Sequence, residues 1–423
     1  MPMLSPKPTD ITLFAETNFR RQQKRFGIRR ADRRYHMYLL GKTGMGKTTL
    51  MENLILSDIR SGEGVAVLEP HGDLSGRLLE RIPSYRINDV IYIDPADVEF
   101  PVGLNMLEEV SPAHRPVLIS GVLEVFKMLY QKSWGTKMEH IFRHALLTAL
   151  EVPKSTLFTV SRLLTDLQFR ERIIPRLSDK ALQAFWEKEF RNYDKRQRTE
   201  AVSPILNKIG QFSADPLIRN IVGQHKSTIR FQEVLDRKRI LLANLAKGKI
   251  GQDNATLIGA LLLTKLQVAA LGRANIPEDQ RADFYLYVDE CQNFLTESLA
   301  SMMAEMRKYR LNLILANQHL DQLNEFPAIR AAILGNTGTL IAFRTGAPDA
   351  TVLQEEFFPR VSKQDFVRLP KHQVFLRLMI EGVASEGFSA RTLPPQSIVV
   401  GNEEKIIRVS RERYGRPLYM ASG

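Results

Sequence analysis

Cysteine is almost missing from this sequence of 423 residues, which contains only Cys291. A single thiol can form neither an intramolecular disulfide nor a thiolate metal site, so a disulfide-stabilised secreted scaffold is excluded and a reducing, cytoplasmic setting is favoured. The eight histidines are scattered and show no metal-ligand spacing. Cys291 lies beside two acids but has no identifiable histidine partner, and we interpret it as a small side chain packed behind a strand.

Long apolar runs are also missing. No run approaches the roughly 18 consecutive apolar residues of a transmembrane helix. The first residues include proline, aspartate and arginines, whereas a signal peptide has a short apolar core. We therefore expect no membrane span and a cytoplasmic protein, for which peripheral contact with the inner face of a membrane stays open.

Acidic residues are fewer than basic ones, 47 against 59, which gives a net charge of +12. Such an excess favours a polyanionic partner, either nucleic acid or an anionic membrane surface. Residues 20–34 hold eight bases against one acid, Asp32. This run fits a solvated basic face, a structural lead-in to the first strand, or a contact with DNA or lipid phosphate, and the sequence leaves these readings open.

What is present is an alternation of buried strands and helices. Short apolar runs bounded by turn residues predict strands, and each of the first ones is followed by helical spacing, which is typical of parallel βαβ units. We therefore predict an α/β fold with a mainly parallel, doubly wound sheet. The predicted strands are 36–40, 64–69, 89–94, 239–245, 284–288, 311–315 and 338–343, with an antiparallel pair, 373–380 and 387–390, at a sheet edge.

Helical periodicity without strands between the third and fourth predicted strands indicates an all-α insertion. Trp134 and Trp186 lie in it and are predicted to be core anchors. Further on, Asp253 or Asn254 can cap a long apolar helix that stops before Gly272. The predicted domains are a basic N-terminal segment 1–35, an ATPase domain in two parts 36–110 and 233–395, the all-α insertion 111–232, and a basic helical tail 396–423.

The motif GKTGMGKT follows the first predicted strand and precedes a helix, as a phosphate-binding P-loop does. Its glycines let backbone N–H groups turn inward around phosphate, and the helix N-terminus adds a favourable dipole. Lys47 is predicted to reach the β and γ phosphates, and Thr48 to ligate Mg²⁺. The predicted ATP-binding residues are Gly41, Lys42, Thr43, Gly44, Met45, Gly46, Lys47, Thr48 and Thr49.

A pair of acids, Asp289 and Glu290, follows the strand 284–288, at the edge of the sheet where ligands bind. We predict that Asp289 holds the Mg²⁺ water shell and that Glu290 orients the attacking water, so that hydrolysis is the expected reaction. Glu69 ends a neighbouring strand and is a rival base. Gln318 follows the strand 311–315 closely and is predicted to sense the γ-phosphate.

These motifs resemble the HerA/FtsK-type translocases, and most closely the TraG-like and TraD-like coupling ATPases of conjugation and type IV secretion. The resemblance rests on HMYLLGKTGMGKTTL, EPHGDL, the all-α insertion, FYLYVDECQNF, AEMRKYRLNLILANQ and GNTGTLIAFR. It implies a RecA-like P-loop NTPase that assembles as a hexameric ring and pumps DNA with ATP. It also implies that Arg307 reaches the γ-phosphate of a neighbouring subunit, with Arg310 and Arg344 as weaker candidates.

The resemblance has two departures, since the sequence lacks the transmembrane helices of membrane-anchored coupling proteins and the N-terminal β-barrel of HerA proteins. Contact with relaxosome or secretion-channel proteins is accordingly left open. The main hypothesis is a DNA translocase in conjugative or mobile-element transfer. The alternatives are a protein-secretion or assembly ATPase and a nucleotide-gated adaptor with slow ATPase activity. Lys247 and Lys249 could face nucleotide or a pore, but a solvated loop is the favoured reading.

Overall fold

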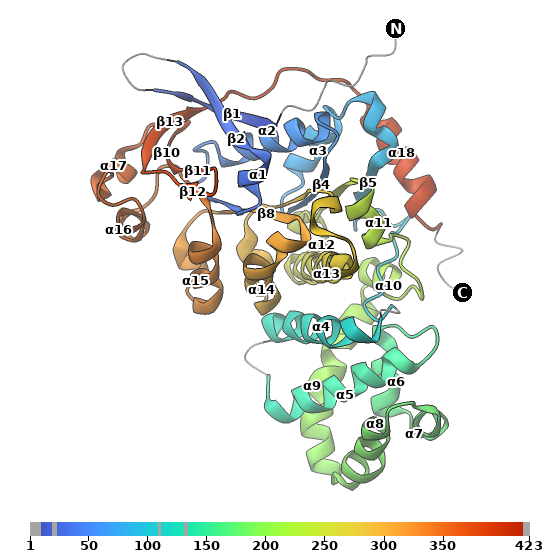
Figure 1. Cartoon of the computed structure of the whole chain (residues 1–423). Coiled ribbons are helices and arrows are strands. Elements are labelled where there is room, and N and C mark those ends of the chain that lie inside the picture. The colour runs from blue at the N-terminus through green and yellow to red at the C-terminus, as the bar shows by residue number, and fades with distance from the viewer. Residues whose placement is uncertain (1–9, 19–22, 109–110, 131–133, 418–423) are drawn as a thin grey trace. The chain divides into compact units, whose positions relative to one another are not determined.

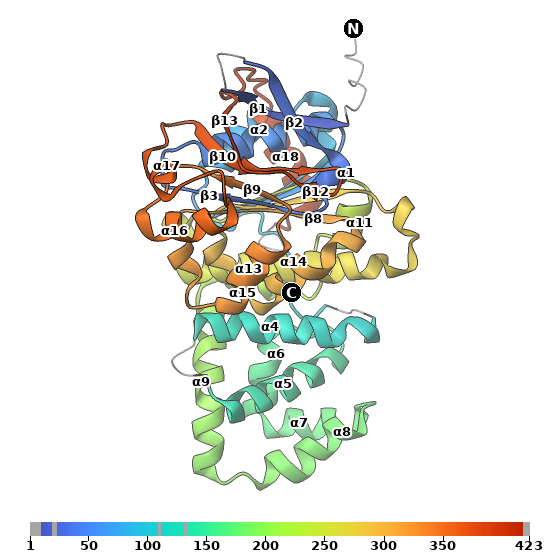
Figure 2. The same cartoon turned by 60° about the vertical axis from the view of Figure 1, so that its left-hand side comes forward.

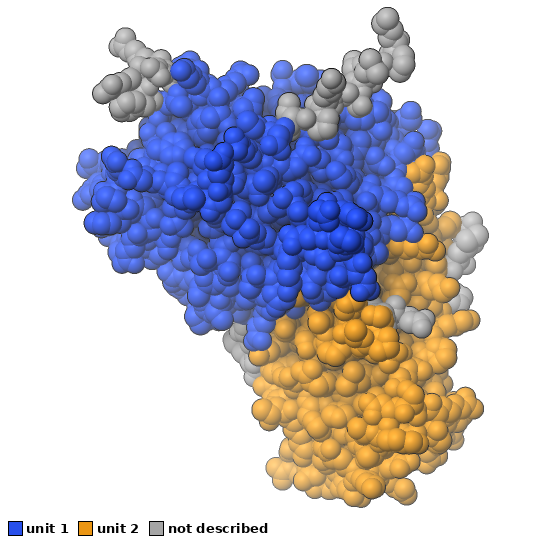
Figure 3. All heavy atoms as spheres, in the orientation of Figure 1, with its two compact units in different colours: residues 1–93, 231–246, 269–410 blue, residues 94–230, 247–268, 411–423 orange. Residues whose placement is uncertain are grey.

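The computed structural model describes residues 10–18, 23–108, 111–130 and 134–417. The chain forms two compact units, shown in different colours in Figure 3. Unit 1 consists of residues 1–93, 231–246 and 269–410, and unit 2 of residues 94–230, 247–268 and 411–423. Unit 1 carries the whole of the large sheet, and unit 2 is built mainly of helices (Figure 1).

The sheet of unit 1 has eleven strands in the order β2-β1-β13-β10-β9-β3-β8-β7-β4-β6-β5. The seven strands from β9 to β5 run parallel, whereas β10, β13, β1 and β2 pair antiparallel. The predicted α/β fold with a mainly parallel sheet is confirmed. The parallel strands are β3 (Met37–Leu40), β4 (Gly64–Glu69), β5 (Val90–Ile93), β6 (Ile240–Asn244), β7 (Phe284–Val288), β8 (Leu311–Asn317) and β9 (Thr339–Ala342).

Helices cover both faces of this sheet. Helices α2 (Lys47–Arg60) and α3 (Asp73–Leu79) lie on one face, and α14 (Glu297–Glu305) and α15 (Pro327–Asn336) lie on the other (Figures 1 and 2). Burial on both faces explains why the central strands read as continuous apolar runs. The core under α2 and α3 takes alternate residues of each strand, including Met37, Leu39, Val65, Val67, Ile240, Leu242, Tyr285 and Tyr287.

The N-terminal segment contains two strands that the sequence did not predict, β1 (Ile11–Thr17) and β2 (Arg25–Arg29). Strand β1 pairs with β13 (Phe388–Thr392), which in turn pairs with β10 (Gln373–Arg377). The predicted antiparallel pair is therefore present, but it lies inside the sheet, and β2 forms the edge. Residues 379–380 and 383–384 form a separate two-stranded sheet, β11 and β12, instead of extending β10.

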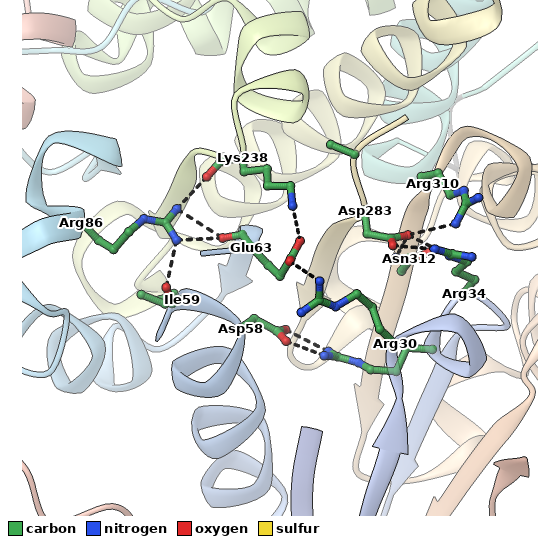
Figure 4. A network of polar contacts seen from close by, with 12 residues as sticks. Arg30, Arg34, Asp58, Ile59, Glu63, Arg86, Lys238, Asp283, Arg310 and Asn312 are labelled. Carbon is green, nitrogen blue, oxygen red and sulfur yellow. Dashed lines mark hydrogen bonds and ion pairs between the residues drawn. The ribbon is translucent and has the colours of Figure 1, made fainter. Parts of the chain in front are cut away.

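Much of the basic run 20–34 has a structural role, although Arg20 and Arg21 lie outside the described residues. Arg30 pairs with Glu63 at 2.7 Å, and Arg34 makes two hydrogen bonds to Asp283 at 2.9 and 3.0 Å (Figure 4). Both acids lie directly before parallel strands, β4 and β7, so the bases meet the amino ends of these strands. The structural lead-in is the reading that these contacts support.

In unit 2, the predicted strand-free insertion is a set of helices, and Trp186 is buried with its indole N–H donating to Thr148 at 2.8 Å. Residues 94–110 and 247–268, which the prediction placed in the ATPase domain, group with these helices. The helices are α4 (Arg115–Leu129), α5 (Thr136–Glu151), α6 (Leu157–Thr165), α7 (Leu167–Ile173), α8 (Lys180–Ala184), α9 (Lys195–Ala214) and α10 (Pro216–Val222).

The long apolar helix α13 (Gln252–Leu271) begins one residue before the predicted cap Asp253. With the turn that follows it, residues 252–275 are long and apolar enough to cross a membrane, but 89% of the apolar window is buried within the chain. Such burial is typical of a helix in a protein core. The predicted C-terminal helix is present as α18 (Glu403–Tyr414).

A fully buried ion pair joins the N-terminal segment to the first P-loop helix. Arg33, in the short helix α1 (Arg30–Arg33), is 1% exposed and forms a two-fold hydrogen bond with Asp58 of α2. Arg33 also donates to the Tyr287 hydroxyl of β7 at 2.7 Å and lies over the ring of Tyr285. The Tyr287 hydroxyl donates in turn to Asp58. These contacts pair the two charges with each other inside the protein.

We expect Asp58→Ala to lower the free energy of unfolding by about 3–5 kcal/mol, because the Arg33 charge then stays buried without a partner. Arg33→Met combined with Asp58→Leu is expected to recover most of that loss, since no charge remains. Urea unfolding followed by circular dichroism measures both. The exposed pair Arg196–Glu200 provides the control, and Arg196→Ala should change little. Equal destabilisation by the single and double variants would contradict a charge-based role.

Candidate nucleotide-hydrolysis site

The predicted P-loop connects the end of β3 to the start of α2. Gly41, Gly44 and Gly46 all have positive φ, at 155°, 76° and 118°. A Cβ on Gly41 would lie 2.5 Å from Cβ of Phe343, and one on Gly46 would lie 2.8 Å from the His372 ring. Glycine is therefore required here for both backbone conformation and space. The loop is further held by the Lys42 N–H, which donates to the Arg344 carbonyl at 2.9 Å.

Lys47 is the first residue of α2 and is buried against the loop. Its ammonium donates to the carbonyls of Gly41 and Lys42. Burial lowers its pKa, while the charges of Asp289 and Glu290 oppose that change. A buried cation is thus held next to two acids by the turn of its own loop.

The acid pair follows β7 directly, as predicted. Strand β8 lies between β7 and the P-loop strand β3, and all three run parallel, so the acid pair and the P-loop follow strand ends at the same edge of the sheet. Asp289 is 7% exposed, and its carboxylate accepts the Glu290 N–H at 2.9 Å. Burial raises the pKa of Asp289 to about 6; the hydrogen bond from Glu290 opposes the rise, and the neighbouring acid charge adds to it. This carboxyl group is therefore costly to ionise in the folded protein.

Glu290 has a left-handed backbone conformation with φ 45°, which is unfavourable for a residue with a side chain. Two contacts from Asn293 hold it, since the Asn293 backbone N–H and side-chain amide both donate to the Glu290 carbonyl, at 3.0 and 2.8 Å. Together with the bond to Asp289, they fix the backbone at this position.

The Glu290 carboxylate is the centre of a chain of side-chain hydrogen bonds. One oxygen accepts from the Gln318 amide, and the Gln318 carbonyl accepts from the Thr43 hydroxyl at 2.8 Å. The other oxygen lies 3.1 Å from Nε2 of His71. The predicted residues of the P-loop, the acid pair and Gln318 are thus brought together at the carboxyl edge of the sheet.

Comparison with known proteins agrees with this geometry. The family model described as the central domain of helicase HerA matches residues 31–241, and the model described as the TraM recognition site of TraD and TraG matches residues 283–355. The chain is a P-loop protein of the HerA/TraG type. No curated protein sequence matches significantly.

Solved structures share the HerA/TraG-type fold. The plasmid coupling protein TrwB in complex with ADP and Mg²⁺ is 12% identical, with a TM-score of 0.66 over 93% of this chain and 97% of that chain. VirB4 of Thermoanaerobacter pseudethanolicus is 14% identical, with a TM-score of 0.58 over 93% of this chain and 98% of that one. At such identities the likeness establishes the RecA-like fold and the helical insertion.

Glu69, the rival base, serves the loop after β4 in this HerA/TraG-type fold. It is 1% exposed, and its carboxylate accepts the backbone N–H groups of His71, Gly72 and Ser75 at 3.1, 2.7 and 3.2 Å. Both of its oxygens are therefore engaged by backbone N–H groups at the N-terminus of α3, and its charge contributes to the raised pKa of Asp289. The Glu290 oxygens, in contrast, meet the side chains of Gln318 and His71.

Arg307 lies at the other edge of the sheet from the P-loop. It precedes β8, and its guanidinium stacks on the ring of Tyr35 at 3.5 Å, just before β3. A contact with phosphate would therefore have to involve another subunit. Arg310 lies beside Asp283 at 3.8 Å, and the backbone of Arg344 supports the P-loop of its own chain.

Two side chains of the site were not assigned from the sequence. His71 was visible within EPHGDL, but its distance from Glu290 depends on strand order, which a sequence does not display. The ring of His372, before β10, approaches Gly46, and the His372 backbone N–H donates to the Met45 carbonyl at 3.1 Å. Cys291 is buried and its thiol donates to Asn317 at 2.7 Å, in agreement with a packing role.

The pKa of Asp289 predicts a pH-dependent cost to stability. The folded-state pKa, about 6, exceeds the ordinary value of 3.8, so the folded protein binds this proton more tightly than the unfolded chain. Stability contributed by the protonated group is present below pH 3.8 and is lost as the pH rises to about 6. Above that pH, Asp289→Asn should be more stable than the wild type by up to about 3 kcal/mol.

Urea unfolding between about pH 3.5 and about pH 7.5, with EDTA and without nucleotide, measures this difference in the free energy of unfolding. The stability gap between variant and wild type should widen up to about pH 6 and then stay constant. A variant that is less stable than the wild type at neutral pH would show that ionised Asp289 is stabilised by its surroundings.

Proposed function

We propose that this protein is an ATP-hydrolysing motor of the coupling-protein type that moves DNA through an oligomeric ring. The observation that carries the ATPase half is the chain of contacts Thr43–Gln318–Glu290 beside Lys47 and Asp289. A protein that only binds nucleotide as a switch has little need for a complete hydrolytic set. The setting proposed is conjugative or mobile-element transfer, in the cytoplasm, with partners in a relaxosome or secretion channel.

In this proposal ATP is the substrate, and its terminal phosphoryl group is transferred to water. Glu290 accepts a hydrogen bond from the attacking water and orients it in line with the bond that breaks. Lys47 and the P-loop N–H groups neutralise charge on the phosphate oxygens, and ADP and phosphate leave. Gln318 contacts both the P-loop through Thr43 and the base, so it is suited to report phosphate occupancy to Glu290.

The residues present fit a magnesium ion that is bound by few protein groups. Among the described residues, no group of three or more His, Cys, Asp or Glu could hold a metal. Mg²⁺ commonly keeps several waters and binds through one carboxylate plus substrate phosphates. Asp289, buried and with acceptor capacity left beyond its one backbone contact, suits that arrangement, with the Thr48 hydroxyl as the second protein group. When bound, Mg²⁺ would neutralise charge on the transferring phosphate.

The DNA half rests on the net charge of +12 and on membership of the HerA/TraG type. The basic run 20–34 contributes less to this argument than its sequence suggests, because Arg30, Arg33 and Arg34 are paired with acids of their own chain. Ring assembly is proposed from the same family likeness, and Arg307, which lies at the edge away from its own P-loop, is then available to a neighbouring subunit.

We expect steady-state ATP hydrolysis that DNA stimulates severalfold at low salt, with the stimulation falling as salt screens phosphate contacts. Lys47→Ala and Glu290→Gln should each lower kcat by about 100-fold or more, and Gln318→Ala by a smaller factor. Coupled-enzyme assays with single- and double-stranded DNA at two salt concentrations measure both effects.

Glu200→Gln, in the exposed ion pair with Arg196, is the matched control for Glu290→Gln and should retain full turnover. Hydrolysis that is indifferent to DNA at low salt would exclude the translocase and favour a secretion or assembly ATPase. Absence of hydrolysis in the wild type would favour the nucleotide-gated adaptor.

The role of Arg307 in trans can be tested by mixing subunits. Arg307→Ala and Lys47→Ala should each be inactive alone, whereas mixed rings should regain part of the activity. In such rings some sites combine an intact P-loop with an intact arginine from the next subunit. Lys308→Ala, an exposed neighbour, is the control and should stay active by itself. Failure of the mixture, with rings confirmed by light scattering, would remove Arg307 from the proposed site.

A further inference from the structure

The loop after β4 is built to hold one histidine in place. Glu69 accepts the N–H groups of both His71 and Gly72, so the backbone that carries the histidine is anchored on both sides of its α-carbon. Gly72 has φ 94°, and a Cβ there would lie 2.9 Å from the Asn244 amide oxygen. The loop therefore cannot shift toward β6 and has a left-handed turn that suits glycine.

The side chain of His71 extends from this loop to the acid pair. Its Nε2 lies 3.1 Å from Oε2 of Glu290, the oxygen that Gln318 leaves free. The Glu290 side chain is 14% exposed and the His71 side chain 55% exposed. The Glu290 carboxylate thus meets side chains on two sides, the Gln318 amide that follows β8 and the His71 imidazole that follows β4.

We infer that His71 is a positioning residue for hydrolysis, which fixes the carboxylate of Glu290 by donating its Nε2–H to Oε2. This inference rests on the proposed function, and it adds a residue that acts on the base without touching the substrate. A glutamate side chain has several rotatable bonds, and ordering it costs conformational entropy at the moment of reaction unless its neighbours hold it beforehand.

The contact between His71 and Glu290 also gives a reason why Glu69 is buried and why both of its oxygens accept backbone N–H groups. An acid at this position is costly to bury unless its oxygens are bonded, and here three N–H groups meet it. As a result, the loop has one defined conformation next to Glu290. Glu69, His71 and Glu290 thereby form a sequence of supports, in which each residue orients the next.

The test uses two substitutions that differ in reach. An amide nitrogen of glutamine can occupy the place of Nε2, whereas the shorter asparagine ends near the place of Nδ1. His71→Ala and His71→Asn should lower kcat about 10- to 100-fold with KM for ATP changed less than about threefold, and His71→Gln should recover most of kcat. The exposed His225→Ala is the matched control and should behave as wild type.

Each outcome has a distinct meaning. Full turnover in His71→Ala, or equal loss in His71→Gln and His71→Asn, would overturn the positioning role while leaving the proposed ATPase intact. A rise in KM at constant kcat would also overturn it, because it would indicate a role in binding substrate. A wild-type protein without turnover would overturn the proposed function and this inference together. Thermal unfolding of every variant checks that the fold is retained.

Discussion

The buried contact of Arg33 with Asp58 and Tyr287 determines how the parts of the site meet. It joins three segments that are distant in sequence: the helix before β3, the end of the P-loop helix α2, and β7, which carries Asp289 two residues later. A buried charge needs a partner with good geometry, so the three segments have one low-energy arrangement. The P-loop directly precedes α2, and the acid pair directly follows β7.

The parallel register then brings the chemistry to one edge. In such a sheet every strand ends on the same side, and the residues after β3, β4, β7 and β8 are the P-loop, His71, the acid pair and Gln318. Arg307 and Tyr35 lie before strands and therefore at the opposite edge. Strand direction alone therefore separates the edge that carries the candidate site from the edge where arginines pair with acids.

The central strands were predictable because strands buried on both faces have continuous apolar sequences. The P-loop was predictable because its glycine spacing is required by a specific backbone conformation. Strands β1 and β2 were not predictable in this way. In β1, Ile11 and Leu13 are exposed while Phe14 is buried, and a shift in register interrupts the pairing. In β2 the sequence RFGIR lies within a basic run, where charge conceals the alternation. Strand order, which fixes His71 and Glu69 in their places, is long-range information that local patterns do not contain.

The site combines several features that would be unfavourable elsewhere. Asp289 is a buried acid with a raised pKa, Glu290 has a left-handed backbone, and Lys47 is a buried cation. Each is compensated locally: by the Glu290 N–H, by Asn293, and by the loop carbonyls, respectively. Because these compensations come from backbone groups and from amides, they do not consume the charges themselves. The carboxylates and the ammonium group keep the capacity to interact with phosphate, metal and water, and the surrounding core supplies the stability that the site gives up.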